Sequence, residues 1–182
     1  MSVKRLVIDG YGQIELNNVA WRRDGRIEAQ CALSAEDFAE VGYAENGMLL
    51  AVDNVNRVIK LPVKGMELPL AIVYSSEHIY DERYPGLKNY VNKIDSFCPR
   101  MGYPAIGDKF TTNCVSYDDA VYTDMDALRE ALAEGAVYGG KHTDGSILVS
   151  ATKPTEGPVF LVTAVTTMPD GQTGIKFQVL SV

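Results

Sequence analysis

Turn chemistry constrains the fold of this chain more than any other feature of its sequence. Five dipeptides join an aspartate or asparagine to a glycine: Asp9-Gly10, Asp24-Gly25, Asn46-Gly47, Asp144-Gly145 and Asp170-Gly171. Such dipeptides tolerate the positive φ angles of tight turns, and several of them lie between segments in which polar and apolar residues alternate. Alternation around tight turns is typical of β-hairpins, so the sequence predicts a mainly β protein.

Three hairpins are predicted, two at such dipeptides and one at a turn rich in aspartate and asparagine. The first turns at residues 24–25, between QIELNNVAW and RIEAQCAL. The second lies within ENGMLLAVDNVNRVIKLP and turns near residues 53–56, and the third joins PVFLVTAVTTM to TGIKFQVLSV through PDGQ. In the last strand, three apolar side chains share one face, Ile175, Phe177 and Val179.

Two short helices are expected to interrupt the strands. SAEDFAEV, residues 34–41, begins with a serine that can cap a helix and is followed by Gly42. DMDALREALAEG has Thr123 as its expected cap and Gly135 as its stop signal. The single apolar stripe of the second helix predicts a position on the outside of a sheet or barrel.

We expect two regions along the chain. Residues 1–96 form an N-terminal β-rich docking region that ends in an extended connector arm at about residues 71–96. Tyrosines and β-branched residues are frequent in this arm, and it contains Pro85-Gly86. Residues 97–182 form a C-terminal domain with one short helix and at least four further strands. The strand spacing suits a small β-barrel, which hides strand edges that otherwise template aggregation.

Charge and hydropathy exclude two classes of partner. The formal net charge of the 182 residues is -7, which argues against nucleic acid because phosphate binding needs clustered cations. No apolar run approaches the ~20 residues that cross a membrane, and the N-terminus lacks the apolar core of a signal peptide. Residues 1–66 are near neutral, with eight basic and nine acidic residues, whereas residues 67–182 carry nine and fifteen. We therefore expect a chain that is made and folded in a cytoplasm.

The sequence provides few residues for covalent catalysis. A cysteine hydrolase would need Cys114 or Cys98 beside one of the two histidines, His78 and His142. Cys114 lies within a strand pattern, and neither thiol has a base close to it in the sequence. The three cysteines form no close pair, so we expect reduced thiols and no catalytic residue.

Metal and cofactor motifs are also missing from the sequence. The two histidines have no HxH or HExxH spacing, and neither a GxGxxG nor a GxxxxGK[ST] phosphate loop is present. Four carboxylates lie near one another in the sequence and are candidate calcium ligands, Asp118, Asp119, Asp124 and Asp126. The EF-hand pattern fails there, and helix capping explains two of the four, so we expect no metal and no cofactor.

The C-terminal region resembles a known family. The order PR-x-GY, GDKFTTN, a short helix, EGAVYGGKHTDGSILVSA and TTMPDGQTGIKFQV, over residues 97–182, is similar to small virion proteins of tailed bacteriophages. In particular it resembles the β-barrel of capsid decoration proteins, which bind the outside of the major capsid shell and stabilise it. The resemblance implies a non-enzymatic structural protein of a virion, assembled in the bacterial host cytoplasm, with the major capsid protein or other virion proteins as partners. It also implies a homo-oligomer, with a trimer as one form.

The residue types that most often carry interface energy are aromatic residues and arginines. The candidates lie in the N-terminal strands and the arm: Trp21, Arg22, Arg23, Tyr80, Arg83, Tyr84 and Tyr90. Two alternative functions stay open at this point. One is a tail or head-fibre structural subunit, and the other is an adhesion module that binds glycans through exposed tyrosines.

Overall fold

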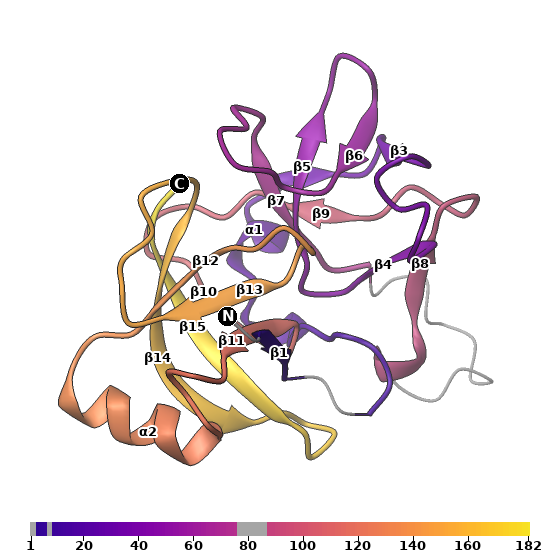
Figure 1. Cartoon of the computed structure of the whole chain (residues 1–182). Helices are drawn as coiled ribbons and strands as arrows, with labels where there is room; N and C mark the ends of the chain where they lie inside the picture. The colour runs from indigo at the N-terminus through magenta and orange to yellow at the C-terminus, as the bar shows by residue number, and fades with distance from the viewer. Residues whose placement is uncertain (1–2, 7–8, 76–86) are drawn as a thin grey trace.

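The computed structural model describes residues 3–6, 9–75 and 87–182, which form a mainly β molecule with two α-helices (Figure 1). The large sheet has seven strands: β1 (Val3–Arg5), β10 (Lys109–Thr112), β11 (Val115–Asp118), β12 (Tyr138–Lys141), β13 (Ile147–Ser150), β14 (Val159–Thr167) and β15 (Thr173–Ser181). The second sheet has six: β2 (Ile27–Glu28), β3 (Ala32–Leu33), β5 (Leu49–Asp53), β6 (Val58–Lys60), β7 (Leu70–Val73) and β9 (Met101–Gly102). A two-stranded ladder joins β4 (Tyr43–Glu45) to β8 (Val91–Lys93). The helical elements are α1 (Ala20–Arg23), α2 (Met125–Glu134), and the 3-10 turns Leu16–Asn18 and Leu87–Asn89.

The large sheet is strongly curled. Its strand order is β1-β11-β13-β12-β14-β15-β10, so four strands separate β11 from β10. Yet only Asn113 and Cys114 separate these two strands along the chain, so the three Cα–Cα steps from Thr112 to Val115 span at most about 10 Å. The sheet must therefore curl so that the end of β10 lies close to the start of β11. Among the described strands no ladder joins β10 to β11, so the predicted closed barrel stays a prediction.

Two of the three predicted hairpins are confirmed. β5 and β6 pair antiparallel around the turn at residues 54–57, where the side chain of Asp53 accepts a hydrogen bond from the backbone N–H of Asn56 at 2.9 Å. β14 and β15 pair antiparallel over most of their length. Ile175, Phe177 and Val179 are buried as their alternation predicted.

The predicted hairpin at residues 24–25 is wrong. Leu16–Asn18 and α1 replace its first strand, and β2 pairs with β9 instead. The reason is Trp21, whose fully buried ring packs edge-on against Phe110 and Tyr74. Because a helical turn directs this large side chain into the core, tertiary packing overrides the local alternation.

The predicted helix at residues 34–41 is also wrong, because this segment forms successive turns. Ser34 does act locally as expected: its Oγ accepts a hydrogen bond from the backbone N–H of Asp37 at 3.2 Å. Phe38 is buried, and the N–H of Gly42 donates to the carbonyl of Phe38 at 2.7 Å, which ends the segment. One buried anchor and two short turns offer too few repeated i to i+4 bonds to propagate a helix.

The second predicted helix is confirmed as α2, with a different cap. The side chain of Asp124, not Thr123, accepts hydrogen bonds from the N–H groups of Asp126 and Ala127 at 3.0 and 2.9 Å. Leu128 is fully buried, and α2 packs beside β14 at the periphery of the molecule (Figure 1).

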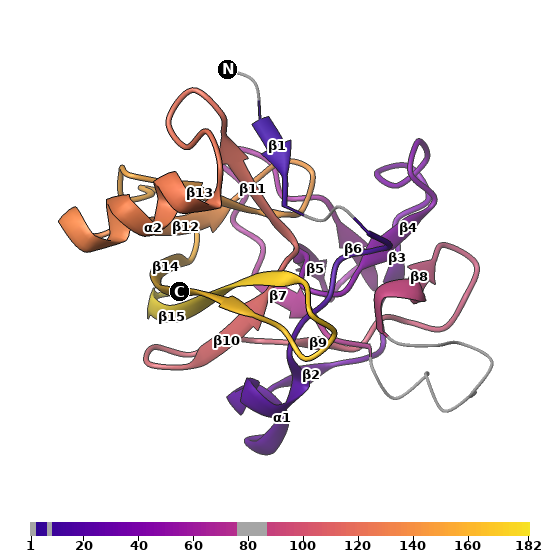
Figure 2. The same cartoon turned by 90° about the horizontal axis from the view of Figure 1, so that it is seen from below.

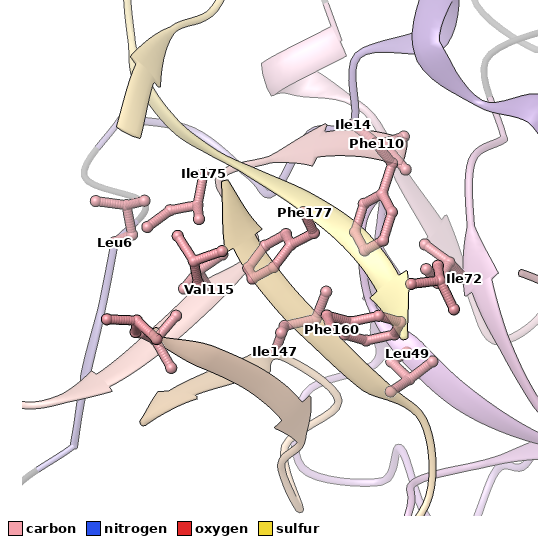
Figure 3. Close-up of a cluster of buried hydrophobic side chains, with 14 of the residues drawn as sticks. Leu6, Ile14, Leu49, Ile72, Phe110, Val115, Ile147, Phe160, Ile175 and Phe177 are labelled. Carbon is pink, nitrogen blue, oxygen red and sulfur yellow. The ribbon is translucent and has the colours of Figure 1, made fainter. Parts of the chain in front are cut away.

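The core is built by both halves of the chain. Phe110, Phe160 and Phe177 pack against one another with ring centroids 5.2 to 6.0 Å apart. Leu49 and Ile72 from the second sheet point into the same cluster (Figure 3).

Strands also cross the expected boundary at residue 97 in both directions. β1 pairs with β11, as Figure 2 shows, and β9 pairs with β2 and β7. The two predicted regions therefore share a hydrophobic core. The expected connector arm begins with β7, whose Ala71, Ile72 and Val73 are fully buried.

Candidate functional site

An ion-pair cluster near the end of β1 joins the seven-stranded sheet to the β4–β8 ladder. The Arg5 guanidinium donates to Glu45 Oε2 at 2.7 Å, and its second nitrogen lies 3.6 Å from Asp144 Oδ2. The same Glu45 oxygen accepts the backbone N–H of Gly12 at 2.9 Å. Burial opposes the Arg5 charge, but its anionic neighbours, including Glu45 and Asp144, outweigh burial and raise its pKa. The cluster therefore cross-links β1, β4 and the turn between β12 and β13.

Cys114 belongs to this cluster and is unsuited to nucleophilic chemistry. Its side chain is fully buried, and Arg5 donates to its sulfur at 3.4 Å. Burial raises the pKa of the Cys114 thiol to about 12, against the effect of the nearby guanidinium. Burial likewise raises the pKa of Cys31, with the Glu28 carboxylate adding to the shift, to about 11. A reactive cysteine needs a lowered pKa and access to solvent, and these two thiols have neither.

Two serines, an aspartate and a histidine form a chain of hydrogen bonds behind the same turn. Asp144 Oδ1 accepts from Ser146 Oγ at 2.6 Å and lies 2.7 Å from His142 Nδ1, and the hydroxyls of Ser116 and Ser146 are 2.6 Å apart. In a serine hydrolase the histidine lies between the serine and the carboxylate, because it takes the serine proton. Here the carboxylate lies between the other two groups, and both serines are fully buried. The chain of bonds holds the turn and does not form a nucleophile.

The four candidate calcium ligands each have another partner in the structure. Asp118 accepts the N–H of Ala120 at 3.0 Å, and Asp119 lies 3.5 Å from the Lys4 ammonium. Asp124 caps α2, and Asp126 pairs with Arg129. Within residues 3–6, 9–75 and 87–182, no group of three or more His, Cys, Asp or Glu side chains is placed to hold a metal ion.

The predicted interface residues have different positions in the structure. Trp21, predicted as an interface residue, is 0% exposed because its ring fills the core. The prediction is corrected for this residue, because a fully buried side chain cannot contact a partner while the chain is folded. Arg22 and Arg23 are exposed on α1, and Arg23 contacts Asp24 at 3.1 Å. Tyr90 is half-buried just before β8, and burial raises its pKa. α1 and β8 lie apart in both views (Figures 1 and 2), so these residues do not form one patch.

Three further candidates, Tyr80, Arg83 and Tyr84, lie outside the described residues, as does His78. Their contribution to an interface stays a prediction.

A cleft that the sequence analysis missed lies between the loop after β6 and the loop after β13. It has a volume of about 470 Å³ and is lined by Lys64, Lys141 and Lys153, by hydroxyl side chains, and by Pro62, Val63 and Leu148. We call it the lysine cleft. Lys64 is far in the sequence from Lys141 and Lys153, so no local motif predicts the cleft, and Lys141 and Lys153 come from the region whose overall charge is acidic.

Glu156 holds the two walls of the lysine cleft together. Its Oε2 accepts the backbone N–H of Gly65 at 3.0 Å and lies 3.3 Å from the Lys141 ammonium, which in turn donates to the carbonyl of Val63 at 3.0 Å. The Gly65 N–H and the Lys141 ammonium lower the pKa of Glu156. The opposite loops are therefore fixed relative to one another.

A second cavity, of about 540 Å³, lies next to the lysine cleft. Residues 36–41 form much of its wall, together with Tyr43, Met48, Leu61, Thr143 and Asp144. Thr143 lines both cavities, and the consecutive residues Leu61 and Pro62 line one cavity each. The two cavities are thus neighbours of opposite charge.

The chain matches no protein-family model, no curated protein and no solved structure. None of the described helices is long and apolar enough to span a membrane.

Proposed function

We propose that this chain is a non-enzymatic structural protein of a phage virion that binds the outside of the major capsid shell and stabilises it. The observation that carries the proposal is how the fold uses a group of partly exposed ionisable side chains together with two buried hydroxyl groups. Arg5, Glu45 and Asp144 connect separate sheets, and Ser116 and Ser146 extend that network into the core. A network of this kind supports a rigid body whose contribution lies in shape and buried area.

The outer surface is consistent with such a role. Large apolar side chains are exposed on loops, with Val55 at 91%, Phe97 at 72% and Ile106 at 71% of their full area. Arg22 and Arg23 project from α1 into solvent. Apolar residues and arginines of this kind suit contacts with a large protein surface.

We further propose that the large sheet acts as a nearly closed barrel. The two-residue link at Asn113 and Cys114 supports this idea, because it holds the end strand β10 close to β11, which lies next to the other end strand, β1. Thr112 supports it as well, since its hydroxyl accepts the Cys114 N–H at 3.0 Å and so stabilises the bend between β10 and β11. An experimental structure with β10 and β11 splayed apart would contradict the barrel.

Binding to purified shells tests the function directly. Shells assembled without this protein are mixed with it and sedimented, which measures binding. The melting temperature of the shells is then compared with and without the bound protein. We expect saturable binding at a fixed ratio to the major capsid protein and a higher melting temperature of the shell. Exchanging both Arg22 and Arg23 for glutamate should weaken binding, whereas Arg129→Glu on α2 serves as a surface control. Absence of the protein from purified virions would remove the proposal.

The location of the protein on the particle distinguishes a capsid-binding role from the alternative role as a tail or head-fibre subunit. Electron microscopy of labelled particles should show it distributed over the head. Labels confined to the tail or to a fibre would instead support a tail or head-fibre subunit.

A further inference from the structure

The lysine cleft and the neighbouring cavity present opposite charges on adjoining surfaces. Lys64 and Lys153 are exposed at the cleft, and Lys141 is its third lysine, whereas Glu156 is the carboxylate among its lining residues. The net positive charge of this cleft is local, since the whole chain carries -7. A cationic cleft on an anionic protein favours an acidic partner segment.

The adjoining surface provides such a segment. Residues 35–41, which we call the acidic loop, expose three carboxylates and no basic side chain, namely those of Glu36, Asp37 and Glu40. Val41 is 49% exposed at the end of the loop. The loop therefore presents carboxylates together with an aliphatic side chain, and the lysine cleft offers ammonium groups together with Val63 and Leu148.

The acidic loop is held in place by its own fold. Phe38 is 1% exposed and anchors its middle, while the hydrogen bonds to Ser34 Oγ and from the Gly42 N–H hold its two ends. A loop ordered before binding loses less conformational entropy when it docks.

We propose that the acidic loop of one copy of this chain docks in the lysine cleft of a second copy, so that two chains associate about a two-fold axis. Thr143 lines both cavities, and in Figure 1 the turn between β12 and β13 lies between the loop that follows β13 and the segment that joins β3 to β4. Where two complementary patches adjoin on one chain, a two-fold axis near their border places each patch against its complement on the other copy. The same contact therefore forms twice in the dimer. The occupant is a second copy because its complementary surface is present in the same chain.

The size of the molecule is compatible with this contact. A stable interface buries about 800 Å² on each partner, which is roughly a tenth of the 9205 Å² accessible surface of this chain. Since the attraction is between exposed charges, it should weaken as salt shortens the Debye length.

Charge reversal tests the proposal with the isolated full-length chain. Sedimentation equilibrium at low salt is expected to show twice the monomer mass of 19.9 kDa. The variant with Lys64→Glu and Lys153→Glu should be monomeric, and so should the variant with Glu36→Lys and Asp37→Lys, because each makes both contacts repulsive. Mixing the two variants should produce a heterodimer, since both contacts become attractive again. Combining all four substitutions in one chain should restore the homodimer.

Matched controls use exposed residues elsewhere. Lys93→Glu with Lys109→Glu, and Glu130→Lys with Glu134→Lys, change the net charge by the same amounts and should leave the dimer intact. A monomeric wild-type chain, a trimer, or a dimer that survives the reversals would overturn the proposal. If the wild-type chain is monomeric and the variant with Lys64→Glu and Lys153→Glu no longer binds shells, the lysine cleft would be a contact site for the capsid and not for a second copy. The sedimentation experiment contains no shell, so a failure of the dimer proposal there does not affect the virion proposal, which the shell-binding experiment tests.

Discussion

At the scale of single residues, close packing between backbone and side chain limits what this fold accepts. Gly102 in β9 lies directly under the indole of Trp21. An added Cβ would overlap the Trp21 Cδ1 and Nε1 atoms, and the ring is fully buried against Phe110 and Tyr74. The ring has no open direction in which to move.

Gly102→Ala is therefore expected to lower the free energy of unfolding by about 3 kcal/mol, as overpacked core substitutions do. Denaturant unfolding followed by Trp fluorescence measures the change. Gly135→Ala is the matched control, because its Cβ would meet no atom within 4 Å and its φ of -176° is extended backbone. Equal stability of the Gly102→Ala and Gly135→Ala proteins would contradict the packing of Trp21 on β9.

The Asp144 carboxylate links stability to pH. Burial opposes its ionisation, but the hydrogen bonds from His142 and Ser146 outweigh burial and hold the pKa of Asp144 well below its usual range. A depressed folded-state pKa contributes stability above the unfolded value of about 3.9, and this contribution is lost as the pH falls below it.

We expect the Asp144→Asn protein to be less stable than wild type at pH 7, with a difference that shrinks as the pH falls below about 4. Denaturant unfolding at pH 7, 4 and 3 measures it. Ser146→Ala removes the hydroxyl donor and keeps the backbone N–H that donates to Asp144 at 2.8 Å, so its acid dependence should be intermediate. Parallel stability curves for wild type and Asp144→Asn would exclude this role.

At the scale of elements, local turn chemistry explains which predictions succeed. The β5–β6 and β14–β15 hairpins each contain a turn signal between two apolar or β-branched segments, so each can be recognised within about twenty residues of sequence. The segment before Asp24-Gly25 alternates as well, but it is placed by Trp21, whose partners Tyr74 and Phe110 are far away in the sequence. No local pattern contains that information.

The candidate site is even less visible in the sequence. Lys64 and Lys153 meet across a cleft only because Gly65 and Glu156 join two loops from opposite halves of the chain. The mainly β class follows from the turns, whereas the cleft depends on how the two sheets pack.

The start of α2 allows a test at this scale, because the sequence predicts Thr123 as the cap and the structure shows Asp124. Asp124→Ala should lower the free energy of unfolding by about 1 kcal/mol, since two backbone N–H groups lose their acceptor. Thr123→Ala, the adjacent control, should change it by less than about 0.5 kcal/mol, as surface substitutions do. Denaturant midpoints measure both. A larger decrease in the free energy of unfolding for Thr123→Ala than for Asp124→Ala would indicate that Thr123 caps the helix, as the sequence predicts.

At the scale of the whole molecule, the shared core decides whether the two predicted regions can fold apart. Phe110 in the C-terminal region packs against Trp21 at a centroid distance of 5.7 Å. Ile14, Leu49 and Ile72 belong to the same cluster, and β1 completes the large sheet beside β11. Removing residues 1–96 would expose these surfaces of the C-terminal region to water.

A fragment of residues 97–182 should therefore be unfolded on its own, although it contains six of the seven strands of the large sheet. The dispersion of its amide NMR spectrum measures this. The control is the full-length chain with a protease site inserted beside the exposed Ser96, which should stay folded after cleavage because both pieces keep the common core. A well-dispersed spectrum from the isolated fragment would contradict this prediction. It would show that the C-terminal region can fold without the apolar side chains of Trp21, Leu49 and Ile72.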